Sequence, residues 1–157
     1  MKISKTNAMR ILDQLKIEYN SYSYKNDDGK IDGISVANKI GKDPKNVYKT
    51  LVAEGHSKDI YVFVISVAEE LDLKKAAKAA GEKNIHMIHV NDILKLTGYI
   101  RGGCSPIGMK KAYRTFIDSN ASDIDNIIVS AGKIGVQVEL VVDDLVRAVN
   151  GILEDLI

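Results

Sequence analysis

Several short segments of the chain are rich in hydrophobic residues, and each predicts a β-strand. The most apolar segment is residues 60–67, where Ile60-Tyr61-Val62-Phe63-Val64-Ile65 contains no charged residue. A strand of this composition is expected to be buried on both faces and to lie centrally in a sheet. The same reasoning predicts strands over residues 47–54, 85–89, 115–118, 126–130 and 136–142, and a tyrosine-rich extended segment over 19–24.

In other segments the apolar residues recur at intervals of three and four, which is the helical pattern. Residues 5–16 predict an amphipathic helix. A short helix is expected behind a cap at Ser35, and another between an Asp72 cap and a Gly81 terminator. Helical patterning returns over residues 143–150.

Strands and helices therefore interleave along the chain without a repeat or a low-complexity linker. This order predicts an α+β (mixed α/β) fold, in which a mixed β-sheet is flanked by helices. A length of 157 residues suits a single domain over residues 1–157 and is too short for two ordinary domains. The composition, 45% hydrophobic and 27% charged, is that of a folded chain.

Charge and cysteine content narrow the function classes. Twenty-two basic and 21 acidic side chains give a net charge of +1, so the basic excess of an autonomous nucleic-acid binder is missing and no DNA partner is expected. The single cysteine, Cys104, suits a reducing compartment, and a cytoplasmic location is predicted. No segment has the roughly eighteen apolar residues of a membrane span, and no secretion leader is visible.

Lys49 is the most informative polar residue, because it interrupts a predicted strand whose neighbours are apolar on both faces. Such a lysine either extends its ammonium to solvent at a sheet edge or stands in a cleft, where it can meet a phosphate or a carboxylate. The pattern alone favours the first arrangement.

Two glycine-rich segments are candidate binding loops. Residues 98–108 hold four of the twelve glycines and one of the two prolines. A loop of this kind can approach a ligand closely and point N–H groups at it, although many such loops only turn a corner. Residues 130–135 form a second loop, for which a simple hairpin is an equal alternative. Neither segment is a Walker loop or a G-x-G-x-x-G motif.

Other candidate chemistry is weaker. Cys104 beside Ser105 suggests a nucleophile, but no histidine lies nearby in sequence, so a packed thiol is favoured. His86 and His89 would fall on opposite faces of a strand with no third ligand, and no metal site is expected. The loop with Asp27, Asp28 and Asp32 lacks the final glutamate of a calcium loop.

Five motifs, in this order and spacing, resemble the YbaK/EbsC family of the prolyl-tRNA synthetase editing-domain superfamily. The most similar subgroup is the freestanding Cys-tRNA(Pro) deacylases, and the resemblance extends from the first helix to Leu140. The motifs are Val47-Tyr48-Lys49-Thr50-Leu51, Leu71-Asp72-Leu73-Lys74-Lys75, Thr97-Gly98-Tyr99, Gly102-Gly103-Cys104-Ser105-Pro106-Ile107-Gly108 and Ser130-Ala131-Gly132-Lys133.

This resemblance implies a YbaK-like fold with a pocket for the aminoacylated 3′-terminal adenosine of a mischarged tRNA. It implies no cofactor and no metal. The essential lysine of the family falls on Lys49, which moves this residue from an edge lysine to a catalytic candidate. The substrate-binding candidates that follow are Tyr24, Thr50, Gly102, Gly103, Cys104, Ser105, Pro106, Gly132, Lys133, Gly135 and Gln137.

Three positions depart from the family pattern. Gln137 stands where similar members carry an aspartate, Ala131 replaces the first glycine of S-G-G-K, and Asn26 replaces a frequent histidine. Gln137 keeps a hydrogen-bonding amide but loses the negative charge that would attract a substrate ammonium.

The resulting hypothesis is a trans-editing deacylase that removes a small amino acid, with cysteine preferred, from tRNA(Pro). Its partners would be the acceptor end of the mischarged tRNA and, in a ternary complex, prolyl-tRNA synthetase. Because no protein nucleophile is identified, either the cysteinyl thiol or a positioned water would attack the ester. The alternatives are another aminoacyl specificity such as alanine, a noncatalytic aminoacyl- or nucleotide-binding module that partners a synthetase, and a thiol redox protein built on Cys104, which lacks a resolving cysteine.

Overall fold

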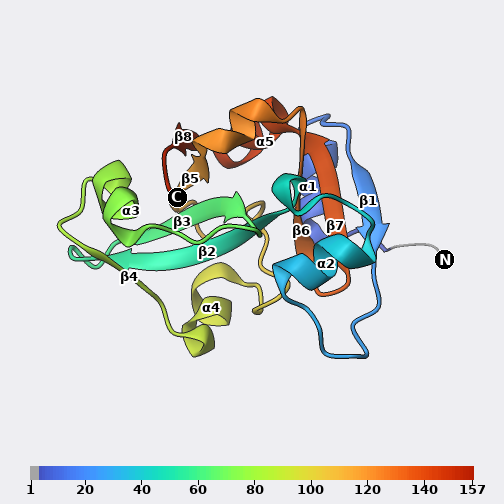
Figure 1. Cartoon of the computed structure of the whole chain (residues 1–157), viewed down its shortest axis with the longest axis horizontal. Helices are drawn as coiled ribbons and strands as arrows, with labels where there is room; N and C mark the ends of the chain where they lie inside the picture. Colours follow the sequence, from blue (N-terminus) through green and yellow to red (C-terminus); the bar gives the residue numbers. More distant parts are fainter. Residues whose placement is uncertain (1–3) are drawn as a thin grey trace.

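The computed structural model describes residues 4–157 and contains five α-helices, two 3₁₀ turns and eight strands (Figure 1). The helices are α1 (Asn7–Gln14), α2 (Gly33–Lys39), α3 (Leu73–Ala80), α4 (Val90–Thr97) and α5 (Val142–Val149), and the 3₁₀ turns are η1 (Pro44–Asn46) and η2 (Ser119–Asp123). The strands are β1 (Asn20–Ser23), β2 (Tyr48–Gly55), β3 (Ile60–Ser66), β4 (Ile85–Met87), β5 (Arg114–Asp118), β6 (Asn126–Lys133), β7 (Val136–Val141) and β8 (Ile152–Glu154).

The strands form two sheets. The larger sheet is mixed and has the order β4-β2-β3-β5-β8, with antiparallel pairing from β4 to β3 and parallel pairing from β3 to β8. The smaller sheet is antiparallel, with the order β1-β7-β6. A single parallel bridge between Val47 and Ile128 joins them. The predicted fold class is thus confirmed, with the strands divided between two sheets.

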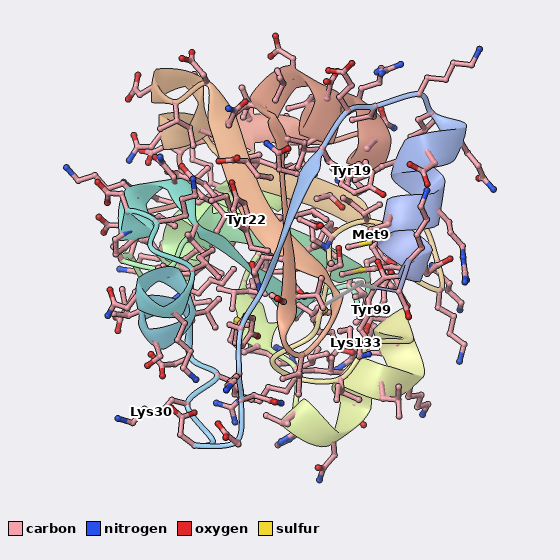
Figure 2. The ribbon with its side chains drawn as sticks, turned by 90° about the vertical axis from the view of Figure 1, so that its right-hand side faces the viewer. Met9, Tyr19, Tyr22, Lys30, Tyr99 and Lys133 are labelled. Atoms are coloured by element: carbon pink, nitrogen blue, oxygen red, sulfur yellow. The ribbon has the colours of Figure 1, made fainter. Side chains whose placement is uncertain are left out.

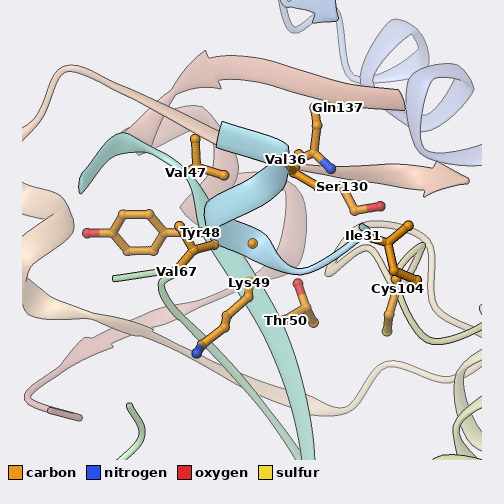
Figure 3. A pocket seen from close by; sticks show the side chains of 12 residues that line it. Ile31, Val36, Val47, Tyr48, Lys49, Thr50, Val67, Cys104, Ser130 and Gln137 are labelled. Atoms are coloured by element: carbon orange, nitrogen blue, oxygen red, sulfur yellow. The ribbon is translucent and has the colours of Figure 1, made fainter. Parts of the chain in front are cut away.

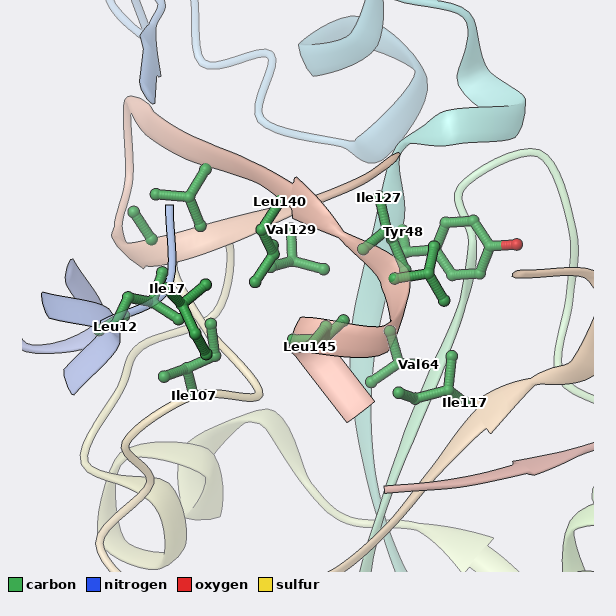
Figure 4. Close-up of a cluster of buried hydrophobic side chains, with 14 of the residues drawn as sticks. Leu12, Ile17, Tyr48, Val64, Ile107, Ile117, Ile127, Val129, Leu140 and Leu145 are labelled. Atoms are coloured by element: carbon green, nitrogen blue, oxygen red, sulfur yellow. The ribbon is translucent and has the colours of Figure 1, made fainter. Parts of the chain in front are cut away.

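Strand β3 is the middle strand of the larger sheet and is buried on both faces, as its sequence predicts. On one face, Val62 and Val64 belong to the main core, which also contains side chains of α1, α5 and the smaller sheet (Figure 4). On the other face, Phe63 and Ile65 pack against the alanines of α3. Packing on both faces therefore holds β3 in place, and the antiparallel pairing of β2 with β3 fixes the position of β2 in turn.

Helix α3 begins and ends at the predicted residues. The Asp72 carboxylate accepts hydrogen bonds from the amides of Lys74 and Lys75, at 2.9 and 3.1 Å, and Gly81 has φ +72°. The predicted cap of α2 is wrong. Asp32 caps this helix by accepting a hydrogen bond from the Ser35 amide at 3.1 Å, so Ser35 lies inside the first turn.

One helix, α4, and one strand, β8, were not predicted. The segment 85–89 is a strand only as far as Met87, and His89 precedes α4 as its cap residue, without a side-chain capping bond. Strand β8 has only three residues and pairs with β5 near the end of the chain. No helix within residues 4–157 is long and apolar enough to span a membrane.

Candidate active site

A cavity of about 110 Å³ lies where the larger sheet meets the smaller one (Figure 3). Its walls come from the start of α2, the start of β2, the first glycine loop and the β6–β7 pair. The lining residues are Ile31, Gly33, Val36, Val47, Tyr48, Lys49, Thr50, Val67, Gly102, Cys104, Ser130 and Gln137. Segments distant in sequence therefore form a single pocket.

The first turn of α2 is held close to the end of β3. A Cβ atom at Gly33 would lie 2.3 Å from Cγ1 of Val67, which is closer than any side chain tolerates. Glycine is required here because of this close packing. The backbone conformation at Gly33 is one that other residues also adopt, so it imposes no such requirement. The contact sets the position of the pocket wall formed by α2.

Lys49 lies on β2 opposite Ile65 of β3 and is half-buried. Its aliphatic stem lines the pocket, while its ammonium points away from Thr50 and Cys104 (Figure 3). None of the ion pairs formed within residues 4–157 involves Lys49. The pocket therefore carries a positive charge at its edge that is free to meet an anionic group.

Thr50 follows Lys49 and points to the opposite face of β2, on the side of Cys104 (Figure 3). Its Oγ1 atom is buried and has no hydrogen-bond partner within residues 4–157. A buried hydroxyl without a partner costs about 1–3 kcal/mol. Because Thr50 lines the pocket, the missing partner is consistent with a bound ligand.

Tyr24 has the same property but lies outside the pocket. Its hydroxyl is buried without a partner within residues 4–157. Its amide donates a 2.9 Å hydrogen bond to the carbonyl of Gly135, which attaches the end of β1 to the second glycine loop. For Tyr24 to bind substrate as predicted, it therefore has to contact a part of the substrate that lies outside the cavity.

Gln137 and Ser130 form the far wall of the pocket. They are opposite each other in the β6–β7 pair, and Gln137 is buried. The Ser130 hydroxyl accepts a hydrogen bond from the amide of Gly132 at 3.2 Å. The wall thus presents a neutral amide and a hydroxyl, with no carboxylate among its lining residues.

Cys104 lines the pocket, but its chemistry does not favour a nucleophile. Burial raises the pKa of the thiol to about 11, and a hydrogen bond from Thr97 offsets this only in part. The thiol is therefore neutral near pH 7, whereas nucleophilic attack requires the thiolate.

The rest of the first glycine loop lies behind the pocket wall. Ser105 and Pro106 are buried, and the Ser105 hydroxyl accepts a 3.1 Å hydrogen bond from the amide of Ile107. At Gly103 a Cβ atom would lie 2.9 Å from the nitrogen of Ile134 in the second loop. These three predicted residues shape the loop and are not among those that line the cavity.

Apart from Ser130, the second glycine loop is also outside the cavity. A Cβ atom at Gly132, where φ is +94°, would lie 2.7 Å from the ring of Tyr99. The Tyr99 hydroxyl in turn donates a 2.6 Å hydrogen bond to the carbonyl of Ile107. Figure 2 shows Tyr99 and Lys133 beside this hairpin, with Lys133 exposed. Gly132, Lys133 and Gly135 thus belong to the support of the site.

Comparison with known proteins assigns the family. Residues 32–148 match the family described as the aminoacyl-tRNA editing domain. The chain belongs to this editing-domain family. The matched range contains every pocket residue except Ile31, and Tyr24 also lies before it.

The relatives of this editing domain include freestanding and synthetase-linked proteins. The chain is 45% identical over 147 residues to EbsC of Enterococcus faecalis, covering 94% of this chain and 90% of EbsC, whose name proposes a Cys-tRNA(Pro)/Cys-tRNA(Cys) deacylase. It is 28% identical over 89 residues to proline–tRNA ligase of Brachyspira hyodysenteriae, covering 57% of this chain and 15% of the ligase. The resemblance seen in the sequence motifs is thereby confirmed.

Solved structures show the same editing-domain architecture. One, described as a trans-editing enzyme candidate for prolyl-tRNA synthetase, superposes with a TM-score of 0.82 at 19% identity over 98% of both chains. Another, the protein APE2540, superposes with a TM-score of 0.85 at 18% identity, over 94% of this chain and 96% of the other. At these identities the agreement supports the fold.

Seven lining residues of the editing-domain pocket were not among the predicted site residues. They are Ile31, Gly33, Val36, Val47, Tyr48, Val67 and Ser130. Most are apolar and resemble ordinary core residues in the sequence, so only tertiary structure places them together. Ser130 belongs to the motif Ser130-Ala131-Gly132-Lys133, and this membership was the signal available in the sequence.

Metal ligands are not clustered in this editing domain. Within residues 4–157, no group of three or more histidine, cysteine, aspartate or glutamate side chains is placed to hold an ion. The ring of His86 instead lies 3.1 Å from the Glu54 carboxylate, on neighbouring strands.

Proposed function

We propose that this protein is a trans-editing aminoacyl-tRNA deacylase that removes cysteine from mischarged tRNA(Pro). The observation that carries the proposal is the pairing of Lys49 and Thr50 on β2. One residue offers an unneutralised ammonium at the pocket edge, and the next offers a buried hydroxyl without a partner. The 45% identity to EbsC supports the assignment to this reaction.

The pocket would hold the aminoacyl group, with the terminal adenosine at its edge. A cavity of about 110 Å³ suits a small amino-acid side chain. In this arrangement the Lys49 side chain rotates toward the substrate, and its ammonium then holds the terminal phosphate or ribose region or polarises the ester. Thr50 donates its hydroxyl proton to an oxygen of the bound aminoacyl ester.

Backbone amides of the first glycine loop are proposed to stabilise charge that develops on the carbonyl oxygen. The Gly103 amide is already engaged, because it donates a 3.0 Å hydrogen bond to the carbonyl of Ile100. The proposed donors are therefore the amides of Gly102 and Cys104, which line the cavity.

Cleavage would not need a protein nucleophile. In the substrate-assisted route, the cysteinyl thiol adds to the carbonyl carbon of its own ester. The ribose hydroxyl leaves with the proton released by the thiol, and water then hydrolyses the resulting thiolactone. In the direct route, a water molecule positioned by other backbone groups adds to the same carbon. Its proton passes to the ribose oxygen, which leaves as a hydroxyl, and the free amino acid is released.

A deacylation panel tests this function. Purified protein is incubated with Cys-, Ala-, Ser- and Pro-charged tRNA(Pro), and the cysteinyl substrate is also presented with its thiol alkylated. We expect selective turnover of the Cys ester. Loss of turnover on alkylation supports thiol attack, whereas retained turnover supports water attack. Absence of turnover on all four esters would contradict the deacylase function.

Alanine is the second candidate for the removed amino acid, because Gln137 gives the pocket a neutral wall. An uncharged amide does not select strongly for the orientation of a substrate ammonium. Faster turnover of Ala-tRNA(Pro) than of Cys-tRNA(Pro) in the same panel would establish this specificity.

The proposed partners are the acceptor end of the tRNA and prolyl-tRNA synthetase. With a net charge of +1, the chain has little excess charge for reading a tRNA body. A ternary complex with the synthetase would therefore supply the selection of tRNA(Pro).

A further inference from the structure

A second, more apolar groove lies beside the pocket and has no role in the deacylation proposed above. It has a volume of about 290 Å³ and lies between β2, β4, α4 and the first glycine loop. Val52, Met87, Val90 and Ile93 form its apolar walls.

The groove adjoins the pocket. Thr50, Gly102 and Cys104 line both cavities. A ligand whose end enters the pocket can therefore extend past these three residues into the groove.

The apolar side chains around the groove are unusually accessible. Met87, Val90, Leu94 and Ile100 are each between 42% and 54% exposed. They come from β4, α4 and the first glycine loop, the segments that also line the groove, and Met87 and Val90 are themselves lining residues. Exposed apolar residues gathered at one place indicate a binding surface.

Arg101 adds a positive charge to this patch. It lines the groove and is exposed, and it takes part in none of the ion pairs formed within residues 4–157. A guanidinium group binds phosphate through paired N–H donors and also stacks on flat rings.

We propose that this groove binds the two cytidines that precede the terminal adenosine of the tRNA acceptor end. The inference rests on the proposed function, because it follows the RNA strand outward from the aminoacyl pocket. The bases lie against the apolar walls, and Arg101 contacts the connecting phosphates. Arginine guanidinium groups are common in sites for single-stranded RNA, where they bind phosphates or stack on bases. A groove that shares a wall with the aminoacyl pocket favours this strand over a protein partner.

The test compares three cysteinyl esters: those of adenosine, of the trinucleotide CCA, and of the same trinucleotide with abasic sites in place of both cytosines. We expect the wild-type protein to show a kcat/KM about tenfold or more higher for the CCA ester than for the adenosine ester. Most of this advantage should disappear with the abasic trinucleotide, which retains the phosphates.

Two groove variants and two matched controls test whether the higher kcat/KM for the CCA ester depends on the groove. Arg101→Ala and Val90→Asp should lower kcat/KM for the CCA ester about tenfold and leave the adenosine ester unchanged. Leu73→Asp is the control for Val90→Asp, because Leu73 is also the exposed first residue of an eight-residue helix. Lys78→Ala, on the exposed face of α3, is the control for the loss of charge. Both controls should behave as wild type on all three esters.

Binding of unacylated CCA, measured by fluorescence anisotropy, gives a second readout that does not depend on turnover. Equal wild-type turnover of the CCA and adenosine esters, with CCA binding unchanged in the groove variants, would overturn the groove proposal and leave the deacylase function standing. Failure to cleave any ester would contradict the deacylase function, while variant-sensitive CCA binding would still support the groove. Groove variants that weaken only self-association or synthetase binding would show a protein interface and overturn the proposal.

Discussion

The ammonium of Lys39 lies 5.8 Å from the centre of the Tyr24 ring and also binds the loop that connects β1 to α2. It donates hydrogen bonds to the carbonyl of Lys25 at 2.7 Å, to the Asp28 carboxylate at 2.8 Å and to the carbonyl of Lys30 at 2.9 Å. The Lys39 side chain therefore fixes the loop that follows Tyr24 to α2, and α2 forms one wall of the pocket.

Replacing Lys39 by methionine should release this loop. We expect the free energy of unfolding to fall by about 1–2 kcal/mol, because charge-assisted hydrogen bonds are lost from a side chain that is only 22% exposed. Amide hydrogen exchange over residues 25–31 should accelerate, and KM for deacylation should rise. Lys45→Met, at an exposed lysine, is the control. Unchanged exchange in Lys39→Met would show that the loop is held by other contacts.

Lys49→Ala should abolish deacylation while the fold remains intact. The ammonium makes no ion pair within residues 4–157, so its removal should change the free energy of unfolding by less than about 1 kcal/mol. Lys49→Arg should rescue poorly, because a planar guanidinium does not replace a compact ammonium in a confined site. Single-turnover deacylation and urea denaturation measure both effects, and a wild-type rate for Lys49→Ala would refute the assignment.

Thr50→Val should stabilise the protein and impair it at the same time. The substitution removes a buried hydroxyl without a partner in residues 4–157, so we expect a gain of about 1 kcal/mol in the free energy of unfolding. Deacylation should fall at least tenfold if the hydroxyl binds substrate. Thr50→Ser, which keeps the hydroxyl, should retain most activity. Full activity of a stabilised Thr50→Val would mean that the hydroxyl does not contact the substrate.

Cys104→Ala and Cys104→Ser should both remain active. The pKa of the thiol is raised from 9.0 to about 11 by burial, so the neutral form is favoured in the folded state until the pH approaches that value. Iodoacetamide should therefore modify the folded protein at pH 8 far more slowly than the urea-unfolded protein. Loss of activity in both folded variants, together with a trapped thioester, would identify Cys104 as a nucleophile.

Recruitment of tRNA should depend weakly on salt. Each phosphate contact contributes roughly 0.9 to the slope of log affinity against log salt, and a site that grips only the acceptor end makes few contacts. The isolated protein should therefore deacylate Cys-tRNAs with different bodies at similar rates, with added prolyl-tRNA synthetase sharpening the preference for tRNA(Pro). Nanomolar affinity with a steep slope would instead reveal a tRNA-reading surface on this chain.

Much of the secondary structure could be predicted because it follows from local chemistry. The apolar run of β3 and the Asp72 cap of α3 are examples in which pattern and structure agree. Helix α4 was missed because four of its eight residues, Val90, Asn91, Asp92 and Thr97, are weak helix formers and its cap residue, His89, makes no capping bond. The division into two sheets depends on long-range pairing, which single-sequence patterns do not encode.

The site could be predicted only in part for a related reason. Lys49, Thr50, Gly102, Cys104 and Gln137 line the pocket, but the other predicted residues support it from behind or outside. A motif shows that residues belong together, yet it does not distinguish a lining residue from one that holds a loop in shape. The apolar lining comes from α2, β2 and the end of β3, and its residues share no sequence signature.

The close contact between Gly103 and the backbone at Ile134 limits how the substrate specificity of this protein can be changed. A Cβ atom at Gly103 would lie 2.9 Å from that backbone, so the two glycine loops are packed directly against each other. An insertion or a bulky substitution in the β6–β7 hairpin would displace Gly102 and Cys104 as well. To redesign the pocket, both loops therefore have to be replaced together by the corresponding loops of a homologue.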